Sequence, residues 1–295
     1  MTTLKVDGIA KRFDERTVLN NITFTVPGGR LTGFVGGNGA GKTTTMRIIL
    51  GVLEADAGQV FLDDTRLEGG NRGRFGYMPE ERGLYPKMRV LEQLVYLARL
   101  HGLSAAAATR NATALVERLG LGERKDEDIE KLSLGNQQRV QIAASLVHDP
   151  EVLVLDEPFS GLDPMAVNVV VDVLRERAAQ GVPVLFSSHQ LDVVERLCDD
   201  VVIIAGGEIR AAGPREELRS RFAGERIAIT LAGDAGWLRS EPGVTVVEFE
   251  GDHALVELDG ITPDALLRTA LDRGGVVAFT PHRPHLAEIF QEVVR

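Results

Sequence analysis

Hydrophobic residues occur in short runs that alternate with longer segments of helical period. Residues 31–35, 151–156 and 182–186 read LTGFV, EVLVLD and VPVLF, and each is apolar over most of its length. Such runs are typical of strands that are buried on both faces of a parallel sheet. Amphipathic segments separate them. The pattern therefore predicts an α/β fold with a mostly parallel sheet wrapped by helices.

Between the first two runs the period changes to about 3.6 residues, as in helices. Residues 91–100 form one apolar stripe, and residues 104–119 form an alanine-rich helical segment that Ser104 can cap. A third helix is expected after the turn KLSLGN at residues 131–136. We therefore expect residues 84–147 to form a helical subdomain inserted in the α/β domain.

The pattern changes again after residue 214. Four short alternating segments predict strands, and the helical segments among them complete a small α+β domain. We expect two domains, at residues 1–214 and 215–295. The second shows no catalytic or metal-binding pattern, and His282 and His285 are interpreted as surface residues.

The first apolar run continues into GGNGAGKT at residues 36–43, which has the spacing G-x-x-x-x-G-K-T of a phosphate-binding loop. Glycines let the backbone approach an anion, and the helix behind them presents N–H groups. Lys42 is expected to reach the β- and γ-phosphates of a nucleotide, and the Thr43 hydroxyl to ligate Mg²⁺. The alternative, a chance glycine turn, is rare at four fixed positions between a strand and a helix.

Two adjacent carboxylates, Asp156 and Glu157, end the second apolar run. Ligands bind at this edge of parallel sheets, so Asp156 can hold Mg²⁺ and Glu157 can act as general base for an attacking water. Acidic residues after strands also cap helices. The phosphate-binding loop in the same chain favours the catalytic interpretation.

Three other positions have both a functional and an ordinary interpretation. Phe13 can stack on a purine ring, or it can be a core or loop residue. Ser133 can contribute to a second anion site at a helix N-terminus, or it can be a plain N-cap. His189 follows the third apolar run and can meet a γ-phosphate, although a single histidine in this place is more often a surface residue.

Composition narrows the class of protein. The 295 residues are 44% hydrophobic and 26% charged, as in ordinary globular proteins. The net charge is 33 − 43 = −10, without a basic stripe, which argues against a nucleic-acid partner. Cys198 is the single cysteine, so we expect no internal disulfide, a reducing compartment and a buried thiol. The sequence shows no signal peptide and no apolar run near the ~20 residues of a membrane span, so we expect that the chain does not cross a membrane by itself but can sit on one through a partner.

Six motifs follow one another in a fixed order: the phosphate-binding loop at 36–43, PEE at 79–81, LSLGN at 132–136, VLVLDEP at 152–158, SGLD at 160–163 and SSH at 187–189. This set resembles the nucleotide-binding subunits of ABC (ATP-binding cassette) transporters over residues 4–213. GYMPEERGLYPKM and the final HLAEIFQEVV resemble one branch, the ATPase subunits of ABC-2-type exporters of the drug- and sodium-efflux kind.

The resemblance implies an ABC ATPase domain of the P-loop NTPase fold that binds ATP and Mg²⁺, followed by an accessory domain. Phe13 would stack on adenine, and Ser133 and Gly135 match the family signature. Three groups of residues are implied: for nucleotide binding Phe13, Gly36, Asn38, Gly39, Ala40, Gly41, Lys42, Thr43, Thr44, Glu80, Ser133, Gly135 and Asp163; for metal binding Thr43, Glu80 and Asp156; for catalysis Lys42, Glu157 and His189.

Two departures from the family pattern stand out. The signature is usually L-S-G-G-Q, and here Leu134 and Asn136 replace its glycine and its glutamine. The loop glutamine that senses Mg²⁺ and the membrane subunit in the family is Glu80 in this chain. Glutamate keeps an oxygen ligand but adds a negative charge.

The resemblance also implies a mechanism. Two copies, expected to be identical, pack head to tail, and each ATP lies between the P-loop of one and the Ser133 and Gly135 turn of the other. Water oriented by Glu157 and His189 attacks the γ-phosphate, and the motion passes to a separate integral membrane permease. We expect a cytoplasmic subunit, peripheral on the inner face of the cell membrane, without a nucleic-acid partner.

Two alternatives compete with the exporter. A soluble ABC ATPase of DNA repair or translation would carry tandem cassettes, long coiled coils or zinc-binding cysteines, and this sequence has one cassette and one cysteine. A P-loop module that binds nucleotide without turnover is disfavoured by the presence of Glu157 and His189.

Overall fold

The computed structural model describes residues 2–68, 73–81, 83–223 and 226–294. The chain forms two compact units, here called unit 1, which ends at residue 215, and unit 2, which begins at residue 216. Each unit has its own hydrophobic core.

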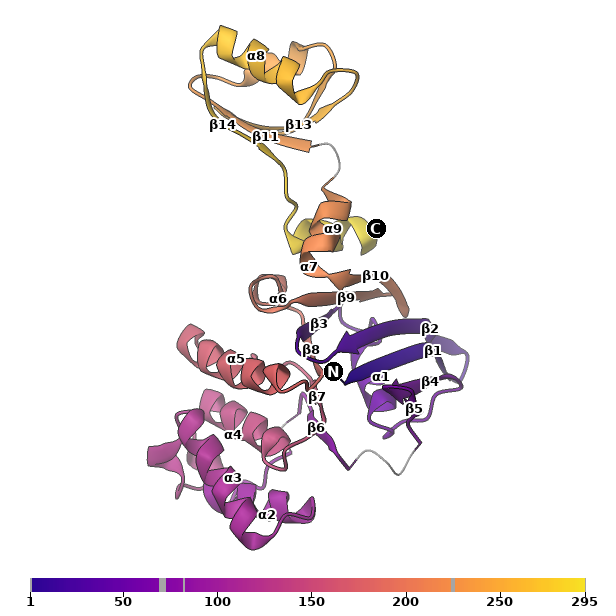
Figure 1. Cartoon of the computed structure of the whole chain (residues 1–295), viewed down its shortest axis with the longest axis vertical. Coiled ribbons are helices and arrows are strands. Elements are labelled where there is room, and N and C mark those ends of the chain that lie inside the picture. Colours follow the sequence, from indigo (N-terminus) through magenta and orange to yellow (C-terminus); the bar gives the residue numbers. More distant parts are fainter. Residues whose placement is uncertain (1, 69–72, 82, 224–225, 295) are drawn as a thin grey trace. The chain divides into compact units, whose positions relative to one another are not determined.

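Unit 1 is built on a six-stranded sheet in the order β10-β9-β3-β8-β7-β6 (Figure 1). The strands are parallel except for β10 at the edge. Every residue of β3, β7, β8 and β9 is buried, so the apolar runs form the centre of a parallel sheet as predicted. The bounds are β3 Leu31–Val35, β6 Phe75–Met78, β7 Val152–Leu155, β8 Val184–Ser188, β9 Asp200–Ala205 and β10 Glu208–Pro214.

A second, antiparallel sheet in the order β2-β1-β4-β5 packs on the first through helix α1 (Lys42–Ile49). Met46 of α1 lies in one core with Leu4 of β1 and Phe34 of β3. The P-loop helix is therefore fixed between two sheets. The strands are β1 Thr3–Phe13, β2 Arg16–Pro27, β4 Ala57–Leu62 and β5 Thr65–Arg66.

Strands β1 and β2 are longer than the sequence predicted. The hydrophobic alternation indicated strands at 3–9 and 21–26, but pairing continues to Phe13 opposite Arg16, and only Asp14 and Glu15 remain in the turn. The end of this hairpin is exposed and polar, so no apolar alternation marks it. Phe13 is 46% exposed there, which excludes the core interpretation.

The helical insertion consists of α2 (Val90–Leu100), α3 (Ala105–Arg118) and α4 (Leu134–Leu146), with two short 3-10 helices, Gly122–Arg124 and Ile129–Lys131. Ser104 caps α3 as predicted, accepting a hydrogen bond from the Ala107 N–H at 3.3 Å. Helix α4 begins at Leu134, so residues 134–136, which were expected at the end of a turn, form the start of the helix. It contacts β6 at the edge of the sheet.

Two more helices, α5 (Pro164–Ala179) and α6 (Leu191–Leu197), follow β7 and β8 and contact β3. Cys198 lies at the end of α6 and is buried, as predicted. Burial raises the pKa of its thiol well above the usual range. This cysteine therefore behaves as a small apolar core residue.

Unit 2 contains a four-stranded antiparallel sheet in the order β12-β13-β11-β14, with α8 (Pro263–Arg273) on one face. Ile227 and Ile229 of the sheet share a core with Leu266 of α8. These elements agree with the predicted α+β arrangement. The bounds of the others are α7 Arg215–Phe222, β11 Arg226–Leu231, a 3-10 helix Gly236–Ser240, β12 Val244–Glu250, β13 His253–Leu258, β14 Val276–Pro281 and α9 Leu286–Val294.

The surface interpretation of His282 is wrong. Its side chain is only 16% exposed, and its Nε2 lies 2.9 Å from Glu288 Oε2 in α9. Burial raises the pKa of Glu288, but hydrogen bonds from the His285 N–H and the His282 ring outweigh it and leave the pKa lowered. His285 is exposed, as expected.

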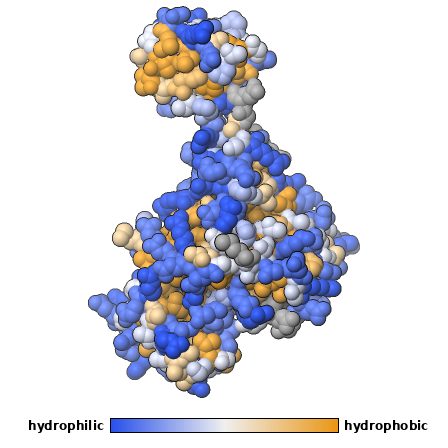
Figure 2. Space-filling view, viewed as in Figure 1, coloured by the Kyte–Doolittle hydropathy of each residue, from blue (hydrophilic) through white to orange (hydrophobic). Residues whose placement is uncertain are grey.

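Apolar residues gather on one side of unit 2 in Figure 2. Its exposed large apolar side chains include Leu271 of α8 and Val277 of β14, at 55% and 70% exposure. Within the described ranges, none of the helices combines the length and the apolar character that crossing a membrane requires.

Candidate functional site

Strand β3 delivers the glycine-rich loop to the carboxyl edge of the sheet. Gly39 and Gly41 adopt φ values of 74° and 112°, which L side chains rarely adopt. A Cβ on Gly41 would also lie 2.5 Å from Leu19 Cδ2. Helix α1 starts directly afterwards at Lys42, so the N–H groups of its first turn have no partner within the helix. The loop and this helix end together form a cradle for an anion.

The Lys42 ammonium lies over its own loop. Its Nζ donates hydrogen bonds to the carbonyl oxygens of Gly36 at 2.7 Å and Gly37 at 3.2 Å. A phosphate bound in the cradle would offer charged acceptors in place of these neutral carbonyls. Lys42 is therefore placed to exchange loop carbonyls for phosphate oxygens.

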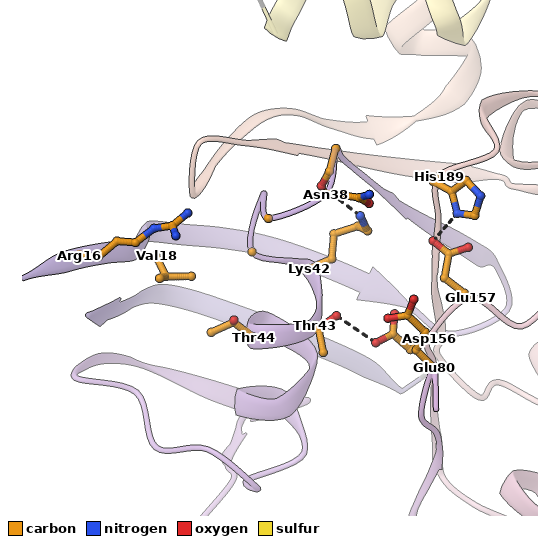
Figure 3. A pocket seen from close by; sticks show the side chains of 13 residues that line it. Arg16, Val18, Asn38, Lys42, Thr43, Thr44, Glu80, Asp156, Glu157 and His189 are labelled. Carbon is orange, nitrogen blue, oxygen red and sulfur yellow. Dashed lines mark hydrogen bonds and ion pairs between the residues drawn. The ribbon is translucent and has the colours of Figure 1, made fainter. Parts of the chain in front are cut away.

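Asp156 is held from two sides at the end of β7. Its Oδ2 accepts a hydrogen bond from the Thr43 hydroxyl at 3.1 Å (Figure 3). Its Oδ1 accepts one from the Ser187 hydroxyl at 2.5 Å. The carboxylate is only 2% exposed. Ser187 comes from the neighbouring strand β8, and sequence reasoning had assigned it no role. Thr43 and Asp156, predicted as metal ligands, are adjacent in space.

Glu157 points away from Asp156 and toward His189. Its Oε1 lies 3.0 Å from His189 Nδ1. The backbone of Glu157 has φ 50°, an uncommon value for a residue with a side chain, and such strain clusters at functional sites. Gln138 of α4 holds this turn by donating to the carbonyl oxygens of Glu157 and Pro158, each at 3.1 Å.

These groups line one cleft of about 780 Å³ (Figure 3). Glu157 and His189 lie at one end of it, and Arg16 and Val18 of the β1–β2 hairpin lie at the other, beyond the P-loop. Sequence reasoning missed Arg16 and Val18, because no motif marks them. The cleft is lined by Lys42 together with Arg16, Val18, Gly37, Asn38, Gly39, Gly41, Thr43, Thr44, Glu80, Asp156, Glu157 and His189.

Some predicted nucleotide-binding residues do not line this cleft. Gly36 and Ala40 are buried within the loop itself. Ser133 caps α4 by accepting a hydrogen bond from Asn136 N–H at 3.4 Å, and Asp163 caps α5 by accepting one from Ala166 N–H at 2.9 Å. Gly135 lies beside Gly161, whose carbonyl oxygen would be 3.2 Å from a Cβ at that position. Phe13 lies outside the lining as well.

The cleft offers oxygen ligands but no complete metal site. In the described part of the chain, no three His, Cys, Asp or Glu side chains are grouped as metal ligands. The Thr43 hydroxyl and the carboxylates of Asp156 and Glu80 are hard oxygen donors of the kind Mg²⁺ prefers, and Mg²⁺ commonly completes its shell with phosphate oxygens and water. The residues present therefore fit a Mg²⁺ ion that is shared with a nucleotide.

Two carboxylates of the cleft also act on a half-buried phenol next to it. Burial raises the pKa of Tyr77 in β6, and the negative charges of Asp156 and Glu80 raise it further, against the effect of Arg47, which hydrogen-bonds the phenol. Both carboxylates thus lie close enough to Tyr77 to affect one hydroxyl group.

Comparison with known proteins agrees with this geometry. Residues 19–160 match the family model described as ABC transporter, and residues 213–294 match the model of the C-terminal domain of DrrA1-3-like ATP-binding proteins. An uncharacterised ABC transporter ATP-binding protein of Bacillus subtilis, YhaQ, is 34% identical over 99% of this chain and 98% of its own. This chain belongs to the ATP-binding subunits of ABC transporters. The cassettes of this family are ATPases.

Two further matches are also ATP-binding proteins of this family. The Nod factor export ATP-binding protein I of Ralstonia nicotianae is 37% identical over 80% of this chain and 75% of its own length. A solved structure of an ATP-binding subunit of an ABC transporter superposes with a TM-score of 0.69 and 33% identity, covering 74% of this chain and 92% of that one. The resemblance to ABC cassettes and the P-loop fold class are thereby confirmed.

Proposed function

We propose that this ABC ATPase energises an exporter by binding ATP and Mg²⁺ in the P-loop cleft and hydrolysing the nucleotide there. One observation carries the proposal: a single cleft contains the phosphate cradle, the Thr43–Asp156 pair and the Glu157–His189 pair. A module that only binds nucleotide would not need the last pair.

The triphosphate lies along the loop and the N-terminus of α1. The N–H groups of residues 39–44 surround its β- and γ-phosphates, and Lys42 leaves the carbonyls of Gly36 and Gly37 to bind phosphate oxygens. The base then extends toward Val18 and Arg16 at the other end of the cleft. Phe13, the strand partner of Arg16, provides an exposed ring for stacking on adenine.

Mg²⁺ would be held by Thr43, Asp156 and Glu80, where it would neutralise the negative charge of the β- and γ-phosphates. Ser187 fixes the orientation of the Asp156 carboxylate, because its hydroxyl donates to Oδ1 while the Thr43 hydroxyl donates to Oδ2.

Glu157 is the general base in this proposal. It accepts a proton from water as the water oxygen attacks the γ-phosphorus, and the bond from that phosphorus to the bridging oxygen of ADP breaks. His189 Nδ1 bonds Glu157 and positions its carboxylate. The other ring nitrogen of His189 remains able to contact the γ-phosphate.

A second copy of the chain completes the site. Ser133, Gly135 and Asp163 do not line the cleft of their own molecule, although the 13-residue helix α4 presents its N-terminal N–H groups beside Ser133. In a head-to-tail homodimer this helix end faces the γ-phosphate bound by the other copy. ATP thereby joins two chains, and hydrolysis separates them.

The membrane partner is an integral permease, and its proposed docking surface lies beside the loop of Glu80. Tyr85, Tyr96 and Leu100, before and along α2, are 55%, 42% and 64% exposed, and aromatic side chains are favoured at protein interfaces.

The subunit would work in the cytoplasm on the inner face of the membrane. The Ralstonia relative, named for Nod factor export, supports an exporter, and the net charge of −10 counts against DNA or ribosome binding.

The substitution Glu157→Gln tests the catalytic assignment. It removes the base but keeps the size of the side chain, so ATP affinity should stay within about twofold while turnover falls by about 10²–10⁴. Hydrolysis is followed by phosphate release and binding by a fluorescent ATP analogue. Glu151→Gln, an exposed glutamate before β7, is the control. Full turnover by Glu157→Gln would remove Glu157 as general base.

A further inference from the structure

The carboxylate of Glu80 reaches the P-loop cleft through the pairing of two parallel strands. Met78 at the end of β6 is the register partner of Leu155 at the end of β7, and Asp156 N–H donates to the Met78 carbonyl at 2.8 Å. The chain therefore leaves β6 next to Asp156. Two residues after Met78, Glu80 lines the same cleft as Asp156 and Thr43 (Figure 3).

Helix α4 fixes the backbone on both sides of Glu80. The Gln141 amide donates to the carbonyl of Pro79 at 2.6 Å and to the carbonyl of Glu81 at 3.3 Å. Gln141 is only 3% exposed, so this clamp is part of the packed interior. The flanking carbonyls are held while the Glu80 side chain is exposed to the cleft.

The charges at this end of the cleft are unbalanced. Glu80, Asp156 and Glu157 contribute three carboxylates, and Lys42 is the cation that the lining provides there, since Arg16 lies at the opposite end. A metal-free ATP brings further negative charge to these carboxylates, and the repulsion opposes the attraction of the P-loop cradle and Lys42. A divalent cation between Glu80 and the phosphates turns the same carboxylate into a ligand.

We propose that Glu80 makes the affinity for ATP depend on the divalent cation, so that the cleft favours the Mg²⁺ complex over free ATP. The inference rests on the proposed function of this cleft. A glutamine at position 80 would offer a neutral oxygen that ligates the metal without repelling free phosphate. Because metal and nucleotide binding are linked, the charge on Glu80 increases the factor by which bound metal raises the affinity for ATP, and ATP raises the affinity for the metal by the same factor.

The test compares Glu80→Gln with the unaltered full-length chain by calorimetric or fluorescence titration of ATP, once with Mg²⁺ and once with EDTA. The ratio of Kd in EDTA to Kd with Mg²⁺ should be about ten times larger for the unaltered chain than for Glu80→Gln. Removal of one nearby charge can produce a difference of this size. The larger part of the change should be tighter binding of metal-free ATP by the variant.

Glu81→Gln is the matched control, because Glu81 is exposed, adjacent in sequence and absent from the cleft lining. It should leave the ratio of the two Kd values unchanged. An equal ratio in Glu80→Gln and the unaltered chain overturns the inference, and so does an equal shift in Glu81→Gln, which would indicate loop charge in general. If the unaltered chain fails to bind ATP with Mg²⁺, the proposed function itself fails. Thermal unfolding of each variant verifies that it is folded.

Discussion

Single side chains hold the cleft in a defined arrangement through hydrogen bonds within the protein. Thr43 and Ser187 fix the two oxygens of Asp156, and His189 contacts Glu157. Ordered side chains of this kind need little rearrangement when charge develops in a transition state. Lys42 is the exception, since the proposed function requires it to leave the loop carbonyls that it contacts.

Arg16 is expected to contribute to nucleotide affinity. It lines the cleft at the end opposite Glu157 and His189, and its side chain is exposed there. Arg16→Ala should weaken ATP binding by about 3- to 30-fold, the range for loss of a cation–π or charge-assisted contact. Equilibrium binding with a fluorescent ATP analogue measures the change.

Arg12→Ala provides the comparison for Arg16, because Arg12 is an exposed arginine of the same hairpin that does not line the cleft. Its affinity should stay near that of the unaltered chain. Equal losses in both variants would mean that the effect is a general one of surface charge.

At the scale of elements, the site residues that the sequence predicted are those next to a recognisable pattern in the sequence itself. The P-loop lies between a strand and a helix, and Asp156 and Glu157 end an apolar run, so each could be found from its neighbours along the chain. Ser187 and Gln138 act through another element, across the sheet or from α4. Sequence order does not reveal such contacts, because they depend on which strands and helices pack together.

The hairpin of β1 and β2 illustrates the same limit. Its exposed end carries polar residues, so hydrophobic alternation stopped at residue 9 and could not place Arg16 in the cleft. The partner of His282 was also hidden, since the contact with Glu288 depends on the turn that leads into α9.

Helix α4 is expected to set the geometry of the catalytic turn. Gln138 bonds the carbonyls of Glu157 and Pro158, and its loss would leave these groups in the interior with fewer partners. Gln138→Ala should lower kcat by about tenfold or more while the affinity for ATP changes little, because the P-loop is untouched. Steady-state hydrolysis combined with ATP titration checks both values. A large loss of affinity with kcat unchanged would contradict this role.

In unit 2, the contacts of Glu288 should make stability depend on pH. The lowered pKa of Glu288 means that its stabilising effect is complete above the unfolded value of about 4.3 and is lost as pH falls through the folded value. The unaltered chain should therefore unfold at a higher temperature than Glu288→Gln near pH 7, and the difference should shrink on acidification below about pH 4. Thermal unfolding of both proteins across this pH range measures the difference, and hydrogen exchange of the α9 amides locates it in the helix. A difference that stays constant across this range would exclude the ionised carboxylate as its source.

At the scale of the whole molecule, the P-loop cleft contains one half of the proposed site. The P-loop and the proposed metal ligands and catalytic pair come from unit 1 of one chain. Ser133 and Gly135, with the altered neighbours Leu134 and Asn136, lie at the start of helix α4, and this helix end does not line the cleft of its own chain. Leu134 is 60% exposed there. In the proposed function, this arrangement gives ATP the role of joining two copies.

The most direct test is the mass of Glu157→Gln in solution with and without ATP, measured by light scattering during size-exclusion chromatography. One chain has a mass of 32.0 kDa. The proposed function predicts a monomer without nucleotide and a particle of twice that mass with ATP and Mg²⁺, because the slowed variant retains the nucleotide that joins the two copies. Adding Lys42→Ala to the same variant should keep it monomeric. A Glu157→Gln protein that binds ATP at saturation and still has the mass of one chain would contradict the shared site.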